Sequence, residues 1–171
     1  MARSGRKILR RTDGAHLKLI NYSISMRAQT AMNNELRRFP ETETGGLLLG
    51  YSDAKRGVQI LEATDGGYLN VLHEEAAFEY DIPYVEHICT ILSELYTPPL
   101  DIVGVWHKHN SISEIPFSLS DENIHRQLVE NMPYPCVSVL FEKTDTLGEK
   151  HEEYKMRIFE LTSSGYFDIG R

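Results

Sequence analysis

Apolar and polar residues recur along the chain with two spacings, which predict helices and buried strands. Three segments carry apolar residues three or four positions apart, as on one face of a helix. They are residues 27–38, a segment that Asp81 caps and Pro98-Pro99 ends, and a segment that opens at Ser118. Pro40 ends the first helix, and Pro83 fits the first turn of the second. We therefore expect about three helices.

Short continuous apolar runs between these helices predict buried strands. The runs cover residues 44–51, 58–63, 102–106, 136–141 and 154–161. Residues 73–80 alternate weakly and predict one more strand, and residues 6–11 and 16–21 flank Asp13-Gly14, a hairpin-turn sequence. The order of these elements predicts a single α/β (α+β) domain, in which about three helices flank a mixed β-sheet.

Charge is distributed unevenly along the chain. The 171 residues carry a net charge of −7, which argues against a general nucleic-acid binder. Residues 1–20 hold six Lys or Arg and one Asp, a net of +5, so the remainder carries −12. We divide the chain into a basic arm, residues 1–16, and one domain, residues 17–171. The arm is either a frayed, solvated segment or a contact for an acidic partner.

The sequence has neither a recognisable membrane segment nor a secretory signal. No apolar run approaches the roughly 20 residues that span a bilayer, and no hydrophobic region follows the basic start. We expect a cytoplasmic protein that does not contact a membrane. Its two cysteines, Cys89 and Cys136, are far apart and do not form a disulfide framework, so we expect both in the core.

Two histidines one residue apart are the first indication of chemistry. His107 and His109 follow the predicted strand 102–106, and residues i and i+2 of an extended chain point the same way, so both imidazoles can reach one ion. Asp121 lies in the first turn of the next helix, after a polar loop long enough to fold back. Ser118 and Asp121 also fit a capping box, in which one carboxylate oxygen caps and the other can bind metal. Two histidines and one carboxylate leave the fourth position of a tetrahedral zinc open, as in catalytic sites.

Such a site needs a general base that takes a proton from water and passes it to the leaving amine. Glu43 is the candidate, because it lies just before Gly45-Gly46 and a buried strand. Glycines let a substrate or another backbone approach closely. Glu41, two residues earlier, is the competing candidate for the base. The other interpretation of Glu41 is a solvated acidic residue in a loop.

Three motifs resemble the JAMM (MPN-plus) zinc metalloprotease family. They are Glu43-Thr44-Gly45-Gly46-Leu47-Leu48-Leu49-Gly50, then Gly104-Val105-Trp106-His107-Lys108-His109, then Pro116-Phe117-Ser118-Leu119-Ser120-Asp121. The resemblance covers roughly residues 17–161. It implies an MPN-like (cytidine-deaminase-like) fold and one zinc ion (Zn2+) per chain, with His107, His109 and Asp121 as the ligands. It also implies that Glu43 acts as base and then acid, and that Ser118 helps to stabilise the oxyanion.

The same resemblance implies an isopeptidase. Members cleave isopeptide bonds after the C-terminus of ubiquitin or ubiquitin-like proteins, so the expected substrate is such a modifier joined to a target lysine, or its precursor. The short chain looks most like the bacterial members, which are often paired with activating and conjugating enzymes, including in antiviral defence. Two other functions stay open, a non-catalytic MPN scaffold and a zinc hydrolase that acts on a sulfur-carrier protein conjugate.

The sequence departs from the family pattern at three places near the histidines. The loop 110–117 has eight residues where seven are usual, which leaves the register of Ser118 open. Asn110 replaces the usual proline, and Lys108 replaces the frequent serine. Lys108 is expected either to steer an acidic group or to point to solvent.

Two further residues near the site have alternative interpretations. Trp106 directly precedes the histidines and is either a pocket wall, as is typical of the family, or an aromatic residue at the edge of the core. His125 follows Asp121 by one helical turn. It either supports the metal site from behind or is a partly exposed helix residue, and we favour the exposed position.

Overall fold

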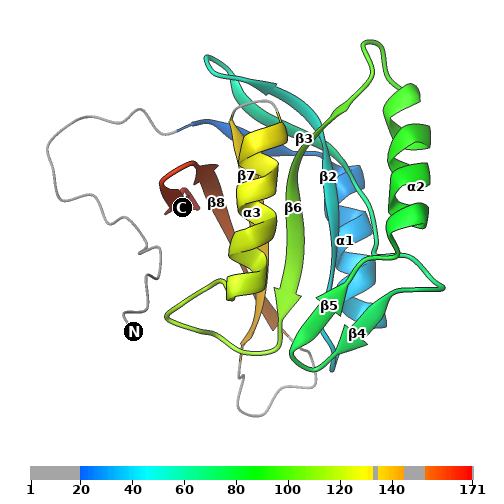
Figure 1. The fold of residues 1–171 in the computed structure, drawn as a ribbon, viewed down its shortest axis with the longest axis vertical. Coiled ribbons are helices and arrows are strands. Elements are labelled where there is room, and N and C mark those ends of the chain that lie inside the picture. Colours follow the sequence, from blue (N-terminus) through cyan, green and yellow to red (C-terminus); the bar gives the residue numbers. More distant parts are fainter. Residues whose placement is uncertain (1–19, 133–134, 145–152, 171) are drawn as a thin grey trace, which may run out of the picture.

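The computed structural model describes residues 20–132, 135–144 and 153–170, which form one mixed sheet with helices on both faces (Figure 1). The seven strands lie in the order β1 (Tyr22–Ile24), β3 (Gly57–Ala63), β2 (Thr44–Asp53), β6 (Asp101–His109), β7 (Cys136–Thr144), β8 (Glu153–Thr162) and β9 (Gly165–Asp168). The pairs β1–β3 and β6–β7 are parallel, and the others are antiparallel. The described part of the chain thus has the α/β (α+β) class and the mixed sheet that the sequence predicted.

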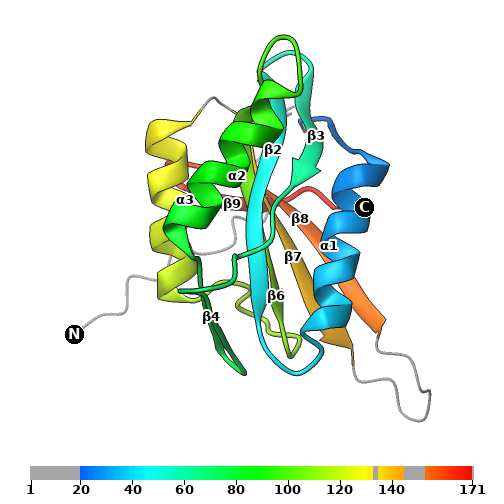
Figure 2. The same cartoon turned by 90° about the vertical axis from the view of Figure 1, so that its right-hand side faces the viewer.

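Helices cover the two faces of the sheet unequally. The helices of the described residues are α1 (Met26–Arg38), α2 (Ile82–Glu94) and α3 (Leu119–Asn131). The first lies on one face, and the other two lie on the opposite face (Figure 2). Side chains of a strand alternate between faces, so Leu48 and Trp106 pack with α1, whereas Leu49 packs with α2 and Val105 with α3. Cover on both faces explains why the central strands are continuous apolar runs in the sequence.

Local sequence accounts for where the helices begin. Ser25 is the N-cap of α1, and its Oγ accepts a hydrogen bond from the N–H of Ala28 (3.1 Å). Asp81 lies at the N-cap of α2, as predicted, but its carboxylate accepts hydrogen bonds from the N–H groups of Leu69 and Asn70 in the preceding loop and makes no cap bond. The prediction was therefore right about the position of Asp81 and wrong about its partner. Within the described ranges, no helix is both long and apolar enough to cross a membrane.

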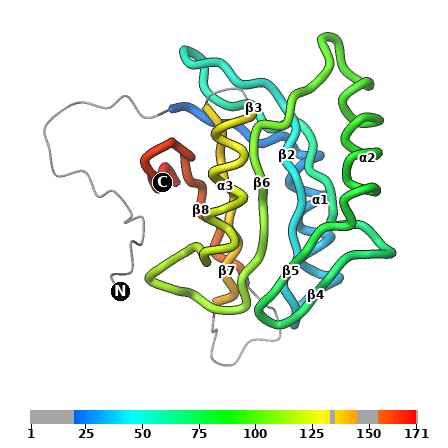
Figure 3. Tube along the Cα trace, viewed as in Figure 1, coloured from blue at the N-terminus to red at the C-terminus, as the bar shows by residue number. Residues whose placement is uncertain are grey.

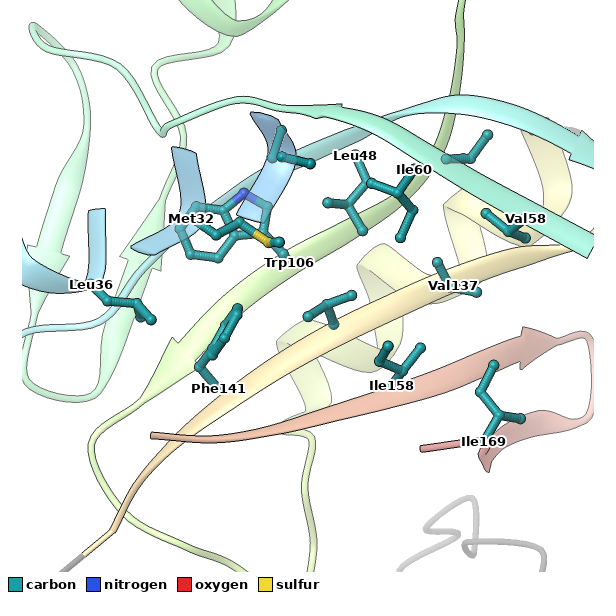
Figure 4. Close-up of a cluster of buried hydrophobic side chains, with 14 residues drawn as sticks. Met32, Leu36, Leu48, Val58, Ile60, Trp106, Val137, Phe141, Ile158 and Ile169 are labelled. Carbon is teal, nitrogen blue, oxygen red and sulfur yellow. The ribbon is translucent and has the colours of Figure 1, made fainter. Parts of the chain in front are cut away.

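A hydrophobic cluster fills the space between α1 and the sheet (Figure 4). Trp106 is completely buried in this cluster, and its Nε1–H donates a hydrogen bond to the carbonyl oxygen of Thr64 (2.8 Å). Trp106 is therefore a core residue and does not form a wall of the site. Cys89 and Cys136 are buried free thiols, as expected.

Several predicted strands need correction. The segment 73–80 is a separate hairpin of β4 (Leu72–Glu74) and β5 (Ala77–Glu79) and not one strand of the main sheet. Strand β6 continues to His109, so both histidines lie within it. The edge strands β1 and β9 were not predicted, because strands of three and four residues carry too little alternation to recognise. The predicted hairpin at Asp13-Gly14 lies outside the described residues, except for residues 20–21.

Candidate metal centre

The C-terminal end of β6 carries two histidines on one face. His107 and His109 are two positions apart on a strand, so their side chains point to the same side, and their Nε2 atoms lie 2.9 Å apart. The backbone at His107 pairs with Gly45 of β2 on one side and with Leu140 of β7 on the other. The two strands therefore fix the position from which the imidazoles project.

Asp121 approaches the histidines from the first turn of α3. The N–H of Asp121 donates to Ser118 Oγ (3.2 Å), and Asp121 Oδ2 accepts from the N–H and the hydroxyl of Ser118 (2.7 Å each), which completes the capping box. Oδ1 lies 3.6 Å from Nε2 of His107, and Oδ2 lies 3.8 Å from Nε2 of His109. One carboxylate thus caps the helix and faces both histidines.

These three side chains form a group that could hold a metal ion. Their donor atoms all lie within 4.8 Å of one another. Zinc bonds of about 2.0–2.1 Å in a tetrahedral arrangement separate the ligand atoms by about 3.3–3.4 Å. The two nitrogens lie 2.9 Å apart, and each is close to a different oxygen of Asp121, at 3.6 and 3.8 Å, so the side chains would rotate to bring one donor atom each to that spacing. Imidazole nitrogen and carboxylate oxygen are also donor types that zinc binds.

The same three groups have the protonation states that metal binding requires. Burial lowers the pKa of His107 and of His109, and this effect outweighs the Asp121 carboxylate, which raises both. Burial raises the pKa of Asp121, but His107, the hydrogen bonds from Ser118 and His109 together bring it below its ordinary value. At neutral pH, two uncharged imidazoles and one carboxylate therefore face a common point.

A cleft of about 150 Å³ lies beside this group, and Glu43 forms part of its wall. Glu43 is half-buried directly before β2, and burial, followed by the Asp121 carboxylate, raises its pKa to about 7, while the Lys108 cation acts in the opposite direction. Glu41, by contrast, has a side chain that is 79% exposed and pairs with Lys143 (3.4 Å). Glu41 is therefore the solvated loop residue, and Glu43 has the environment of a general base.

Ser118 lines the same cleft despite the eight-residue loop before it. Its Oγ accepts from the N–H of Asp121, and its hydroxyl hydrogen is directed to Asp121 Oδ2. The longer loop 110–117 therefore leaves Ser118 at the N-cap of α3 and beside the candidate ligand Asp121. A role at an oxyanion would require the hydroxyl to turn from the carboxylate towards the cleft.

The β4–β5 hairpin forms another wall of the cleft, through residues 76–80, and sequence reasoning missed this role. Figure 3 shows the hairpin, the end of β6 and the start of α3 at the same end of the molecule. Two hydrogen bonds join the hairpin to Glu43. The N–H of Glu43 donates to the carbonyl oxygen of Glu74 (2.7 Å), and the carbonyl oxygen of Glu43 accepts from Nδ1 of His73 (2.9 Å). The weak alternation of residues 73–80 was the available signal, and it gave no indication of where the segment folds.

His125 is buried behind the candidate ligands, which corrects the prediction of a partly exposed helix residue. It is 5% exposed, lines the cleft and shares a hydrogen bond between its Nε2 and Ser138 Oγ (3.2 Å). The ring of Phe117 contacts both His107 and His125, with centroid separations of 5.8 and 4.5 Å. Burial lowers the pKa of His125 to about 4, so it is uncharged at neutral pH. Its spacing of four residues from Asp121 was the signal for this position.

Lys108 points away from the ligands, as strand alternation requires, but into the protein. It is completely buried, and its Nζ donates to the carbonyl oxygens of Phe39 (2.6 Å) and Pro40 (2.8 Å) and lies 5.5 Å from the ring centroid of Tyr154. The expectation that Lys108 contacts solvent was therefore wrong, whereas steering of an acidic group stays a prediction. The chain that follows α1 covers this face of the sheet and receives the ammonium group.

Known proteins share the fold of this chain more clearly than its sequence. No protein-family model matches the sequence, and no curated protein matches it. Among solved structures, the chain is similar to the solution structure of protein DSY2949 from Desulfitobacterium hafniense, a structural genomics target. The TM-score is 0.55 at 14% sequence identity, over 86% of this chain and 89% of that chain. The likeness concerns the fold alone.

Proposed function

We propose that this protein is a zinc-dependent isopeptidase of the JAMM (MPN-plus) type, with an MPN-like fold. The observation that carries the proposal is the group of His107, His109 and Asp121 beside a cleft that also contains Glu43. Three protein ligands leave one position of a tetrahedral zinc ion open, which is typical of catalytic zinc sites and not of structural ones.

The positions of the surrounding residues support a role for each of them. Zinc, when bound, supplies a Lewis acid that polarises a carbonyl group and lowers the pKa of water to around 7. Glu43 takes a proton from the attacking water and delivers it to the leaving lysine amine, and a pKa of about 7 suits both steps at neutral pH. The Ser118 hydroxyl, now directed to Asp121, turns to donate to the oxyanion.

The proposed substrate is a ubiquitin-like modifier joined to a target lysine, or the precursor of that modifier. The three sequence motifs at residues 43–50, 104–109 and 116–121 support this class. The cleft is small, at about 150 Å³, and so favours a tail with small side chains. The β4–β5 hairpin lies beside it and offers a strand edge to which an extended tail can add. We place the reaction in the cytoplasm, together with the activating and conjugating enzymes that would form the conjugate.

Cleavage of a defined isopeptide-linked conjugate tests this proposal. The zinc-loaded protein should release the modifier from lysine, and a chelator should abolish the reaction. Glu43→Gln should retain zinc and lose about 10²–10⁴ in kcat, because an amide cannot carry the proton. Glu41→Gln is the matched control, since it makes the same change at an exposed carboxylate two residues away and should leave the rate unchanged.

Three results would overturn the proposal or part of it. Full turnover by Glu43→Gln would exclude Glu43 as the base. A zinc-loaded protein that binds conjugates without cleaving any of them would indicate the non-catalytic scaffold. Release of a small thiol compound or amino acid from a sulfur-carrier protein, without isopeptide cleavage, would indicate the other zinc hydrolase.

A further inference from the structure

Lys108 lies between the two histidine ligands in sequence and on the opposite face of β6. Its side chain is completely buried. Taking an ammonium group out of water is costly unless its donors are satisfied. The Nζ of Lys108 meets this requirement with hydrogen bonds of 2.6 and 2.8 Å to the carbonyl oxygens of Phe39 and Pro40. Both of these hydrogen bonds join the buried ammonium group to one short piece of backbone.

That backbone is the segment 39–43, which joins the end of α1 to the start of β2 and ends at Glu43. Asn110 holds the same segment, because its Nδ2 donates to the carbonyl oxygens of Glu41 (3.0 Å) and Glu75 (2.6 Å). Lys108 and Asn110 together bind the carbonyl groups of three consecutive residues, 39–41. The second bond of Asn110 also joins the segment to the β4–β5 hairpin.

The hairpin holds Glu43 from the other side. The N–H of Glu43 donates to the carbonyl oxygen of Glu74 (2.7 Å), and the carbonyl oxygen of Glu43 accepts from Nδ1 of His73 (2.9 Å). The His73 ring also stacks on Phe39, with centroids 3.7 Å apart. These contacts therefore restrain the chain at Phe39 and at Glu43, the residue that carries the carboxylate.

The metal-ligand candidates and the residues that hold segment 39–43 alternate along residues 107–110. His107 and His109 face the cleft side, and Lys108 and Asn110 bind the segment. A movement of this end of β6 would therefore move the imidazoles and the Glu43 segment together. A displacement of about 1 Å in a reacting group can reduce the rate about 100-fold, so the distance between these parts matters for catalysis.

We propose that Lys108 and Asn110 are positioning residues, which hold segment 39–43 so that the Glu43 carboxylate keeps a fixed place relative to the metal ligands. This inference rests on the proposed function for its catalytic consequence. The holding of the segment is a separate property, which can be measured without a substrate. Neither residue lines the cleft, so both act through Glu43.

Lys108→Met tests the proposal with two measurements, hydrogen exchange and steady-state kinetics of the zinc-loaded full chain. Met keeps an unbranched side chain of similar length and removes the three donors. The backbone amides of residues 41–43 should exchange at least about 10-fold faster, while those of β7 stay unchanged. On a cleavable conjugate, kcat should fall about 100-fold and KM should change less than about 3-fold. Lys55→Met, at an exposed lysine in the β2–β3 turn, is the matched control and should change neither.

Unchanged exchange at residues 41–43, or a wild-type kcat in zinc-loaded Lys108→Met, would overturn the proposal. If Lys108→Met does not fold, Asn110→Ala decides by the same two measurements, because it removes donors at a half-exposed position. There the expected fall in kcat is about 10-fold. Failure of the wild-type protein to cleave any conjugate would refute the proposed function instead, and faster exchange in the variant would still show that Lys108 holds the segment.

Discussion

The two faces of the last residues of β6 satisfy their polar groups in different ways. On the α1 side, Trp106 and Lys108 are completely buried, and their N–H donors reach backbone carbonyl groups of the same protein. On the opposite side, His107 and His109 direct their Nε2 atoms towards each other and towards Asp121. The N–H donors on the first face have hydrogen-bond acceptors within the protein. The polar atoms on the second face instead converge on one point, as the donor atoms of a metal site do. Strand alternation thus lets one strand carry a structural face and a face whose side chains could hold a metal ion.

The largest expected effect is the loss of metal binding when a histidine on the second face is replaced. His109→Ala should reduce zinc from about one ion per chain to near zero and abolish cleavage, because it removes one of the three proposed ligands. The metal-free variant should fold as the metal-free wild type does. Elemental analysis after zinc loading and desalting measures the first effect, and thermal unfolding measures the second. His87→Ala, at an exposed histidine of α2, is the control and should keep its zinc.

A substitution on the structural face should instead lower the stability of the protein in the absence of metal. Trp106→Ala empties a completely buried site and leaves the Thr64 carbonyl without its donor, so the free energy of unfolding should fall by about 3–5 kcal/mol. Chemical denaturation of the metal-free protein measures this loss. Stability equal to that of the wild type would contradict the assignment of Trp106 to the core.

A smaller effect is expected from Glu43 as the pH changes. Its pKa rises from 4.5 to about 7 on folding, so the folded protein retains a proton that the unfolded chain releases between these values. The metal-free wild type should therefore lose stability as pH increases from 4.5 to 7, relative to Glu43→Gln, which cannot ionise. Denaturation midpoints of both proteins at pH 4.5 and pH 8 test the sign. Cleavage by the zinc-loaded wild type should fall at acidic pH, where the base becomes protonated.

The smallest expected effect belongs to Ser118, which contributes to both structure and site. Ser118→Ala removes the cap of α3 and should cost about 1 kcal/mol of stability. It also frees Asp121 from a hydrogen bond that orients it, so zinc affinity should fall about 10-fold. Ser25→Ala, at the N-cap of α1, is the matched control, because it should lower stability similarly and leave zinc affinity unchanged. Equal zinc affinities in the two variants would contradict the role of Ser118 in orienting Asp121.

The sequence predicted the parts of the site that depend on local geometry. The two-residue period of a strand placed His107 and His109 on one side, and the capping box placed Asp121 at the start of a helix. The same alternation correctly turned Lys108 away from the ligands. Alternation did not predict what Lys108 contacts. The position of segment 39–43 against β6 is a long-range contact that no local pattern encodes.

The remaining misses have the same physical origin. His125 occupies a helix position whose burial depends on packing against Ser138 of β7, not on the helix pattern. Residues 73–80 gave a strand signal, but their folding into a hairpin over the cleft depends on hydrogen bonds from Glu43 to Glu74 and from Asn110 to Glu75. The two hairpin contacts join residues 31 and 35 positions apart and are fixed only when the sheet is assembled.

X-ray absorption at the zinc edge, on protein loaded with one equivalent of zinc, tests the central claim most directly. We predict a four-coordinate zinc with two imidazole nitrogens and oxygen ligands at about 2.0–2.1 Å, and the loss of one imidazole in His109→Ala. Sulfur ligands at about 2.3 Å, an imidazole count that His109→Ala does not change, or no bound zinc would contradict a centre built from His107, His109 and Asp121.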